Sequence, residues 1–148
     1  MNDQSFIRGR IGYVSGRLHR ILRGKLAQKI EEEGLPINPT HFPVVGSLTF
    51  CGKAITQGEI VELTGIDKHR ISRLVDELLN LGLVEKSINP DNKRQNLVQI
   101  TSKGQGVMNR VKEVMLAMEK EYTQDIPQEE VDVALKVINS IINKLENE

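Results

Sequence analysis

The sequence predicts a mainly helical fold with one small β-hairpin, an α+β arrangement. Apolar residues recur at steps of three and four through most of the chain, which is the period of amphipathic helices. Residues 83–100 differ, because two short runs with apolar positions flank the turn-rich hexapeptide N-P-D-N-K-R. At 148 residues the chain is most economically one domain.

Composition narrows the class of protein. Cys51 is the only cysteine, so an intramolecular disulfide framework is excluded and a reducing compartment is favoured. The chain has few aromatic residues and no Trp, which argues against a groove that stacks single-stranded bases. No apolar run approaches the ~20 residues that span a bilayer, and the N-terminus lacks the apolar core of a signal peptide. We therefore expect a soluble, cytoplasmic protein with no membrane partner.

The formal net charge is zero, but the charges are unevenly distributed. Residues 4–30 contain Arg and Lys with no Asp or Glu, whereas acidic residues dominate from residue 113 onward. Two interpretations remain open: the basic first helix and the acidic tail neutralise each other within a dimer, or both are solvated faces.

A long amphipathic helix is predicted from Phe6 to about Glu33, where Gly34 and Pro36 end it. Its early turns carry Gly9, Gly12 and Gly16, each of which costs roughly 1 kcal/mol relative to Ala. Such a helix is held by partners, or it lets another backbone approach closely.

A second helix follows, capped by Asn38 or Thr40 and ended by Gly52. We expect its apolar residues to face the core: Phe42, Val45, Leu48 and Phe50. Thr56 and Glu59 form a T-x-x-E capping box that opens a third helix, Gln57 to Thr64. Its core candidates are Ile60, Val61 and Leu63.

Gly65 supplies a turn, and Asp67 caps a fourth helix that runs from Lys68 to about Leu81. One face is apolar, with Ile71, Leu74, Val75, Leu78, Leu79 and Leu81. Gly82 ends this helix. Two strands, residues 83–88 and 95–100, then enclose the charged turn, and two helices close the chain, one from Thr101 or Ser102 to about Tyr122 and one after Pro127.

A short helix, a turn, a longer helix and a hairpin form, in this order, a winged helix-turn-helix. We assign it to residues 36–102, flanked by long dimerisation helices at 5–34 and 103–147. In this architecture the second helix of the motif reads the major groove of duplex DNA. The candidate groove residues are Lys68, His69, Arg70, Ser72 and Arg73, and the candidate minor-groove residues at the hairpin tip are Lys93 and Arg94. The alternative is an ordinary solvated helix face and a polar turn.

The motif region resembles the MarR family of bacterial winged-helix regulators. The resemblance lies in T-Q-G-E-I, in the D-x-x-x-I-S-R-L-V-D-x-L run from Asp67 to Leu78, in G-L-V-E-K, and in N-P-D-N-K-R ahead of V-Q-I-T-S-K-G. It implies a homodimer that pairs through its first and last helices and binds pseudo-palindromic operators, usually as a repressor. It also implies release from DNA by a small, often phenolic, ligand or by an oxidant.

The resemblance places Ser72 and Arg73 at groove-reading positions and Arg94 at the wing-tip arginine. One departure concerns the wing, because Asn92 stands where the family usually has an Asp and the acid is displaced to Asp91. We therefore expect a looser wing or a different local pairing.

A ligand pocket in this architecture lies between the first, second and fifth helices. Its candidate lining residues are Tyr13, Arg17, His41, Val45, Met108 and Met115, with Arg17 as the partner of an anion. The alternative for each is an ordinary core or interface residue.

The sequence offers no enzyme signature. No nucleophile–base or paired-carboxylate arrangement stands out, and three scattered histidines make no metal site. Gly104-Gln105-Gly106 lacks the remainder of a dinucleotide fingerprint, so no cofactor is expected. Cys51 is interpreted as a buried small hydrophobe rather than a redox switch. The competing function is a winged-helix protein-interaction module that does not bind DNA.

Overall fold

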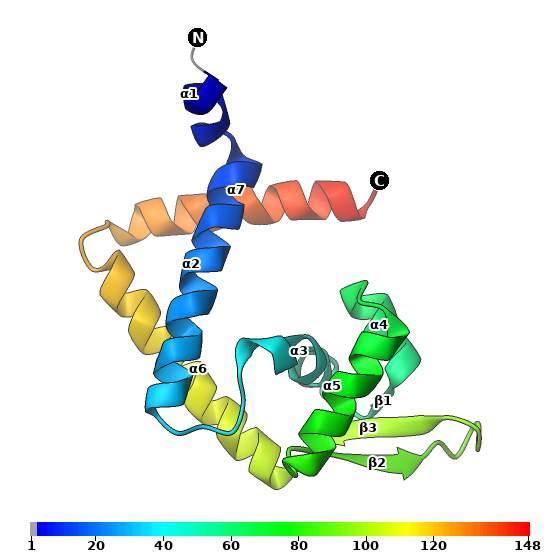
Figure 1. Cartoon of the computed structure of the whole chain (residues 1–148). Coiled ribbons are helices and arrows are strands. Elements are labelled where there is room, and N and C mark those ends of the chain that lie inside the picture. The colour runs from blue at the N-terminus through cyan, green and yellow to red at the C-terminus, as the bar shows by residue number, and fades with distance from the viewer. Residues whose placement is uncertain (1–2) are drawn as a thin grey trace. The chain divides into compact units, whose positions relative to one another are not determined.

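The computed structural model describes residues 3–148, with side chains from residue 6 onward (Figure 1). The helices before the sheet strands are α1 (Asp3–Arg8), α2 (Ile11–Glu32), the 3₁₀ turn η1 (Pro39–His41) and α3 (Phe42–Cys51). Then come β1 (Ile55–Thr56), α4 (Gln57–Thr64), α5 (Lys68–Asn80), β2 (Val84–Ile88) and β3 (Asn96–Ile100). The chain continues with α6 (Ser102–Thr123) and α7 (Gln128–Glu146). The predicted fold class, mainly helical with a small β-hairpin, is confirmed.

The chain divides into two compact units, Met1–Val111 and Lys112–Glu148. The first holds the whole sheet and helices α1 to α5, and the second holds the end of α6 and all of α7. The boundary falls within α6, whose first residues belong to the unit that holds the sheet. Among the described residues, none of the helices combines the length and apolar character that crossing a bilayer requires.

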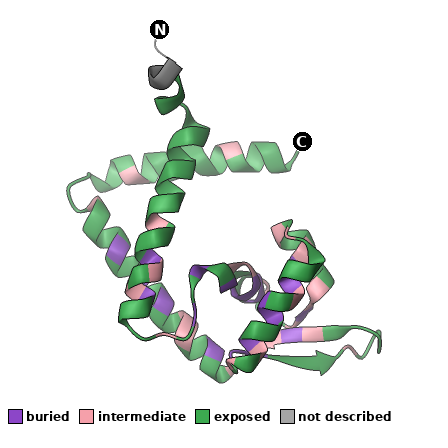
Figure 2. Cartoon of the chain, viewed as in Figure 1, coloured by how far each residue is buried: buried purple, intermediate pink, exposed green. Residues whose placement is uncertain are grey.

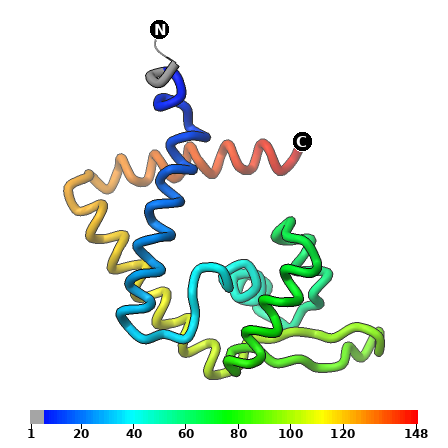
Figure 3. The backbone as a smooth tube through the Cα atoms, in the orientation of Figure 1, coloured from blue at the N-terminus to red at the C-terminus, as the bar shows by residue number. Residues whose placement is uncertain are grey.

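The single first helix predicted over residues 6–33 is wrong in one respect, because the chain breaks at Gly9–Arg10 into α1 and α2 (Figure 3). Arg10 is extended, with φ −96° and ψ 131°. Its backbone N–H donates to the Ile7 carbonyl at 3.0 Å, which closes a turn. Glycine at position 9 has the lowest helix propensity after proline, so the helix interrupts there at little cost.

The core of the first unit lies where α3, α4 and α5 pack on one another and on the sheet (Figure 2). Its buried side chains include Val44, Val45, Leu48, Ile60, Ile71, Val75, Leu78, Leu83 and Val98. Two core predictions are wrong: Phe50 is 83% exposed and Leu63 is 50% exposed. Cys51, expected to be buried, is half-buried at the end of α3.

The sheet has three antiparallel strands in the order β1-β3-β2, one more than the predicted hairpin. β2 and β3 pair from Val84↔Ile100 to Ile88↔Asn96. β1 adds only two pairs to the other edge of β3, Ile55↔Val98 and Thr56↔Leu97. This short strand joins the start of α4 to the sheet and so places the helix-turn-helix beside the hairpin.

The start of α6 approaches the sheet so closely that only glycine fits at position 104. A Cβ atom added there lies 2.0 Å from the Leu83 carbonyl oxygen and 2.8 Å from Ile100 Cγ1. The same junction is held by Thr101, whose hydroxyl donates to the Gly82 carbonyl at 2.7 Å and accepts from the Gly104 N–H at 3.0 Å. The hairpin is thus attached firmly to α6.

Candidate nucleic-acid interface

Local sequence signals set the position of the helix-turn-helix. The predicted capping box is present at α4: the Glu59 N–H donates to the Thr56 hydroxyl at 3.1 Å, and the Glu59 carboxylate accepts from the Thr56 N–H at 2.7 Å. Gly65 ends α4 with φ +67°, a left-handed conformation that residues with a side chain rarely adopt. Asp67 then caps α5 by accepting from the Arg70 N–H at 3.0 Å.

Helix α5 is strongly amphipathic. Ile71, Leu74, Val75 and Leu78 are buried and fix one face against the core. Because that face is occupied, the polar side chains of the first turns face outward: Lys68, His69, Arg70 and Arg73 are exposed, and Ser72 is half-buried at the edge. The five residues predicted to read a DNA groove therefore lie on one helix, and four of them are exposed.

The second half of α5 carries two carboxylates that are both paired. Asp76 lies 3.8 Å from Lys86 Nζ on β2. Glu77 lies 3.0 Å from His41 Nε2 through one oxygen and 3.9 Å from Arg73 Nε through the other. Within α5 the negative charge is therefore confined to the second half of the helix, where Glu77 still lies beside Arg73.

Two side-chain turns order the hairpin tip. Asn89 Oδ1 accepts from the Asp91 N–H at 3.0 Å, and Asn92 Oδ1 accepts from the Arg94 N–H at 3.1 Å. Asn92 thus holds the backbone N–H of Arg94. Within residues 6–148 the Arg94 guanidinium has no recorded ion pair, and Asp91, Asn92, Lys93 and Arg94 are all exposed.

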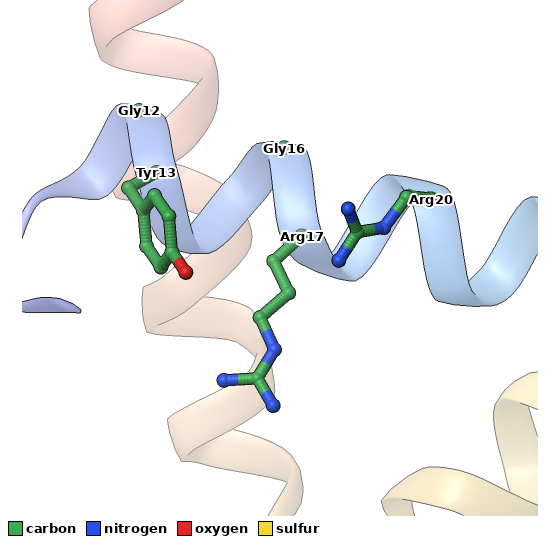
Figure 4. A pocket seen from close by; sticks show the side chains of 5 residues that line it. All are labelled: Gly12, Tyr13, Gly16, Arg17 and Arg20. Atoms are coloured by element: carbon green, nitrogen blue, oxygen red, sulfur yellow. The ribbon is translucent and has the colours of Figure 1, made fainter.

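The structure separates the predicted ligand residues. Tyr13 and Arg17 line an open pocket of about 260 Å³ on α2 with Gly12, Gly16 and Arg20 (Figure 4). His41 and Val45 are buried instead, Met108 is half-buried and Met115 is 49% exposed. His41 was predicted as a ligand residue, but both its ring nitrogens are used internally, by Asn38 and Glu77.

A larger cavity that sequence reasoning missed lies beside α2. It measures about 600 Å³ and is lined by His19, Arg20, Arg23, Gly24, Ala27, Asn38, Pro39 and Thr40. A signal for it exists in the sequence, because Gly24 and Ala27 give α2 little side-chain volume at two positions that line the cavity. A Cβ atom added at Gly24 meets nothing within 4 Å.

No cluster of three or more potential metal ligands is found among the residues the structure describes. Cys51 is a free cysteine and is half-buried, so its interpretation as a buried small hydrophobe is wrong.

The chain is similar to known regulators. The sequence pattern of the MarR family matches residues 35–95. The multiple antibiotic resistance protein MarR of Escherichia coli K12 is 28% identical over 119 residues, which cover 78% of this chain and 82% of that protein. The MarR proteins of Salmonella typhimurium and Salmonella typhi are 32% identical over 100 residues, 67% of this chain and 65% of theirs.

Two solved structures share the architecture. A mutant MarR from E. coli complexed with operator DNA superposes with a TM-score of 0.68 at 26% identity, covering 85% of this chain and 91% of that one. CouR from Rhodococcus jostii RHA1 bound to p-coumaroyl-CoA superposes with a TM-score of 0.72 at 23% identity, covering 91% and 93%.

Proposed function

The chain belongs to the MarR family of transcription regulators, and from this premise we propose that it is a homodimeric repressor that binds pseudo-palindromic duplex DNA. The observation that carries the proposal is the outward-facing basic start of α5, with Lys68, Arg70 and Arg73 exposed beside an ordered hairpin. Arginine side chains grip guanine bidentately in the major groove, and lysine binds phosphate.

The wing supports a second contact. Lys93 and Arg94 are exposed at the end of the hairpin, and the backbone N–H of Arg94 is held by Asn92. A narrow, A·T-rich minor groove attracts such basic side chains. A structural relative of the same fold is complexed with operator DNA, which supports duplex binding by the present chain.

Homodimer formation is supported by apolar residues that the single chain leaves exposed. Ile11, Val14, Leu18 and Ile21 form a stripe on α2. On α7, which has no buried residue, Leu135, Ile138, Ile142 and Leu145 are also exposed. Stripes of this size mark interaction surfaces. A two-fold dimer reads an inverted repeat whose half-sites lie about one helical turn (~10 bp) apart.

The third part of the proposal is a small effector molecule that binds the protein. The proposed location is the cytoplasm, where the protein would have access to DNA. The pockets along α2 hold Arg17, Arg20 and Arg23 with Tyr13 and His19, a set that suits an anion bearing a phenol. CouR is bound to p-coumaroyl-CoA, which supports an effector of this chemical class.

The testing experiment selects bound fragments from fragmented genomic DNA, then titrates a selected duplex against a scrambled duplex of equal length. The proposal expects preference for the selected duplex and affinity that falls steeply with salt, because phosphate contacts release counterions. A parallel titration with 4-hydroxycinnamate tests release. Absence of salt-sensitive duplex binding would favour the alternative, a protein-interaction module.

A further inference from the structure

Glu77 is an acidic residue on the outer side of α5, the helix proposed to enter the DNA groove. Its side chain is 47% exposed. A carboxylate near DNA phosphates repels them, so Glu77 on this helix would weaken DNA binding unless it has another role. Both of its oxygens have partners: Oε2 lies 3.0 Å from His41 Nε2, and Oε1 lies 3.9 Å from Arg73 Nε.

His41 fixes this carboxylate from the protein side. The imidazole side chain is only 6% exposed, and its Nδ1 accepts the Asn38 backbone N–H at 3.3 Å. Because Nδ1 accepts, the ring proton of neutral His41 sits on Nε2 and is donated to Glu77. The ring therefore has one orientation, one tautomer and no unused polar atom.

The anchor changes what Glu77 does for Arg73. An ion pair between exposed residues four apart on a helix is weak, because both long side chains lose rotamer freedom to form it. Here the carboxylate is already immobilised by a buried ring, so only the Arg73 side chain has freedom to lose. The Arg73 side chain, 71% exposed, meets a stationary counter-charge that biases its guanidinium along the helix toward Glu77.

We propose that Glu77 is a positioning residue, held by His41, that restrains Arg73 for reading a base edge and so raises sequence discrimination while lowering affinity for any duplex. The inference rests on the proposed DNA-binding function and adds to it the origin of discrimination. The His41–Glu77 contact joins the segment before α3 to α5 across 36 positions in sequence.

The test compares Glu77→Gln with Asp76→Asn. The first substitution keeps an oxygen that accepts from His41 and removes the charge beside Arg73. The second removes one charge from the neighbouring position, where the partner is Lys86 rather than Arg73. Each variant is titrated with the duplex selected from genomic DNA and with its scrambled counterpart, and melting temperatures verify folding.

Glu77→Gln is expected to raise affinity for the scrambled duplex about two- to threefold, the scale of a single exposed charge interaction. The ratio of selected to scrambled affinity is expected to fall about three- to tenfold, part of the roughly 5- to 150-fold that a full bidentate base contact supplies. Asp76→Asn is expected to strengthen both duplexes alike and leave the ratio unchanged. In an Arg73→Ala background, Glu77→Gln is expected to leave the ratio unchanged as well.

Equal ratios for Glu77→Gln and wild type, or the same fall in the Arg73→Ala background, overturn the inference alone. A His41 ring that carries its proton on Nδ1, read from its ¹⁵N chemical shifts at neutral pH, also overturns it. A wild-type protein that binds neither duplex overturns the proposed function and the inference together, and this arm is measured first.

Discussion

Among single residues, Arg73 combines an exposed side chain on the proposed recognition helix with an acidic neighbour, Glu77, 3.9 Å away. Arg73→Ala should weaken binding to the selected duplex by roughly 1–3 kcal/mol and relax base preference at one position of each half-site. Titration against single-base variants of the duplex measures both effects. Lys68→Ala is the control, expected to weaken all duplexes uniformly; equal losses of Arg73→Ala on selected and scrambled DNA would make Arg73 a phosphate contact.

Gly104 is a second residue whose substitution should have a large effect, in this case on the stability of the fold. Gly104→Ala should destabilise the fold by about 1–3 kcal/mol or more, because its Cβ overlaps the Leu83 carbonyl oxygen at 2.0 Å and backbone must move. Gly106→Ala, two positions along the same helix, meets nothing within 4 Å and should be neutral or stabilising by up to about 1 kcal/mol. Urea denaturation of both variants provides the comparison. Equal stability of the two would contradict the close approach.

Residue roles were predictable where the signal is local. Thr56, Glu59 and Asp67 act as caps because their partners lie three residues away. Glu77 and Gly104 were not predictable, since what each contacts is set by residues far along the chain, His41 in one case and Leu83 in the other. The prediction for Phe50 was wrong for a related reason: helical spacing places it near the apolar face, but its side chain is 83% exposed, and which positions of α3 are covered depends on distant elements.

At the scale of elements, the hairpin carries its own prediction. Arg94→Ala should lower DNA affinity and reduce sensitivity to A·T content beside the half-sites, because the guanidinium is exposed at a tip whose backbone is held by Asn92. Duplexes with A·T-rich and G·C-rich flanks, compared by gel shift, measure this. Lys93→Ala serves as the control for general charge. A titration identical to wild type would remove Arg94 from the interface.

The end of α2 is tied to α6 by an ion pair, in which the Arg110 guanidinium donates to the two Glu33 oxygens at 2.6 and 2.7 Å. These hydrogen bonds hold the pKa of the Glu33 carboxyl below its usual 4.5. A lowered folded-state pKa adds stability above pH 4.5 that is lost as pH falls through the lowered value. Glu33→Gln should therefore melt earlier than wild type at pH 7, and the difference should shrink below pH 4.5. A difference independent of pH would contradict this link.

The elements themselves were predictable to within a residue or two where a cap, a glycine or a turn marks the boundary, as at α4 and α5. The break between α1 and α2 was not, since Gly9 lowers helix propensity without dictating an interruption. β1 was not either, because a two-residue strand has no period of its own and exists only through its pairing with Leu97 and Val98.

At the scale of the whole molecule, the prediction concerns assembly. α7 has an exposed apolar face and no buried residue, so a charge placed on that face leaves the fold of the chain intact. Ile138→Glu should convert the dimer to monomer in light scattering, because an interface core that receives an unpaired carboxylate must desolvate it. DNA affinity should fall with it, since one half-site contact replaces two.

Lys136→Glu is the matched control, a charge change on an exposed polar position of the same helix. It should leave both the mass and the DNA affinity near wild type if the apolar face makes the interface. A stable dimer of Ile138→Glu would exclude α7 from the interface. The next surface to test would then be the exposed apolar stripe on α2, formed by Ile11, Val14, Leu18 and Ile21. Leu18→Glu is the test variant there, and Arg17→Glu is its control. Loss of the dimer in Leu18→Glu, with the dimer kept in Arg17→Glu and in Ile138→Glu, would assign dimerisation to α2 and leave the apolar face of α7 for another partner.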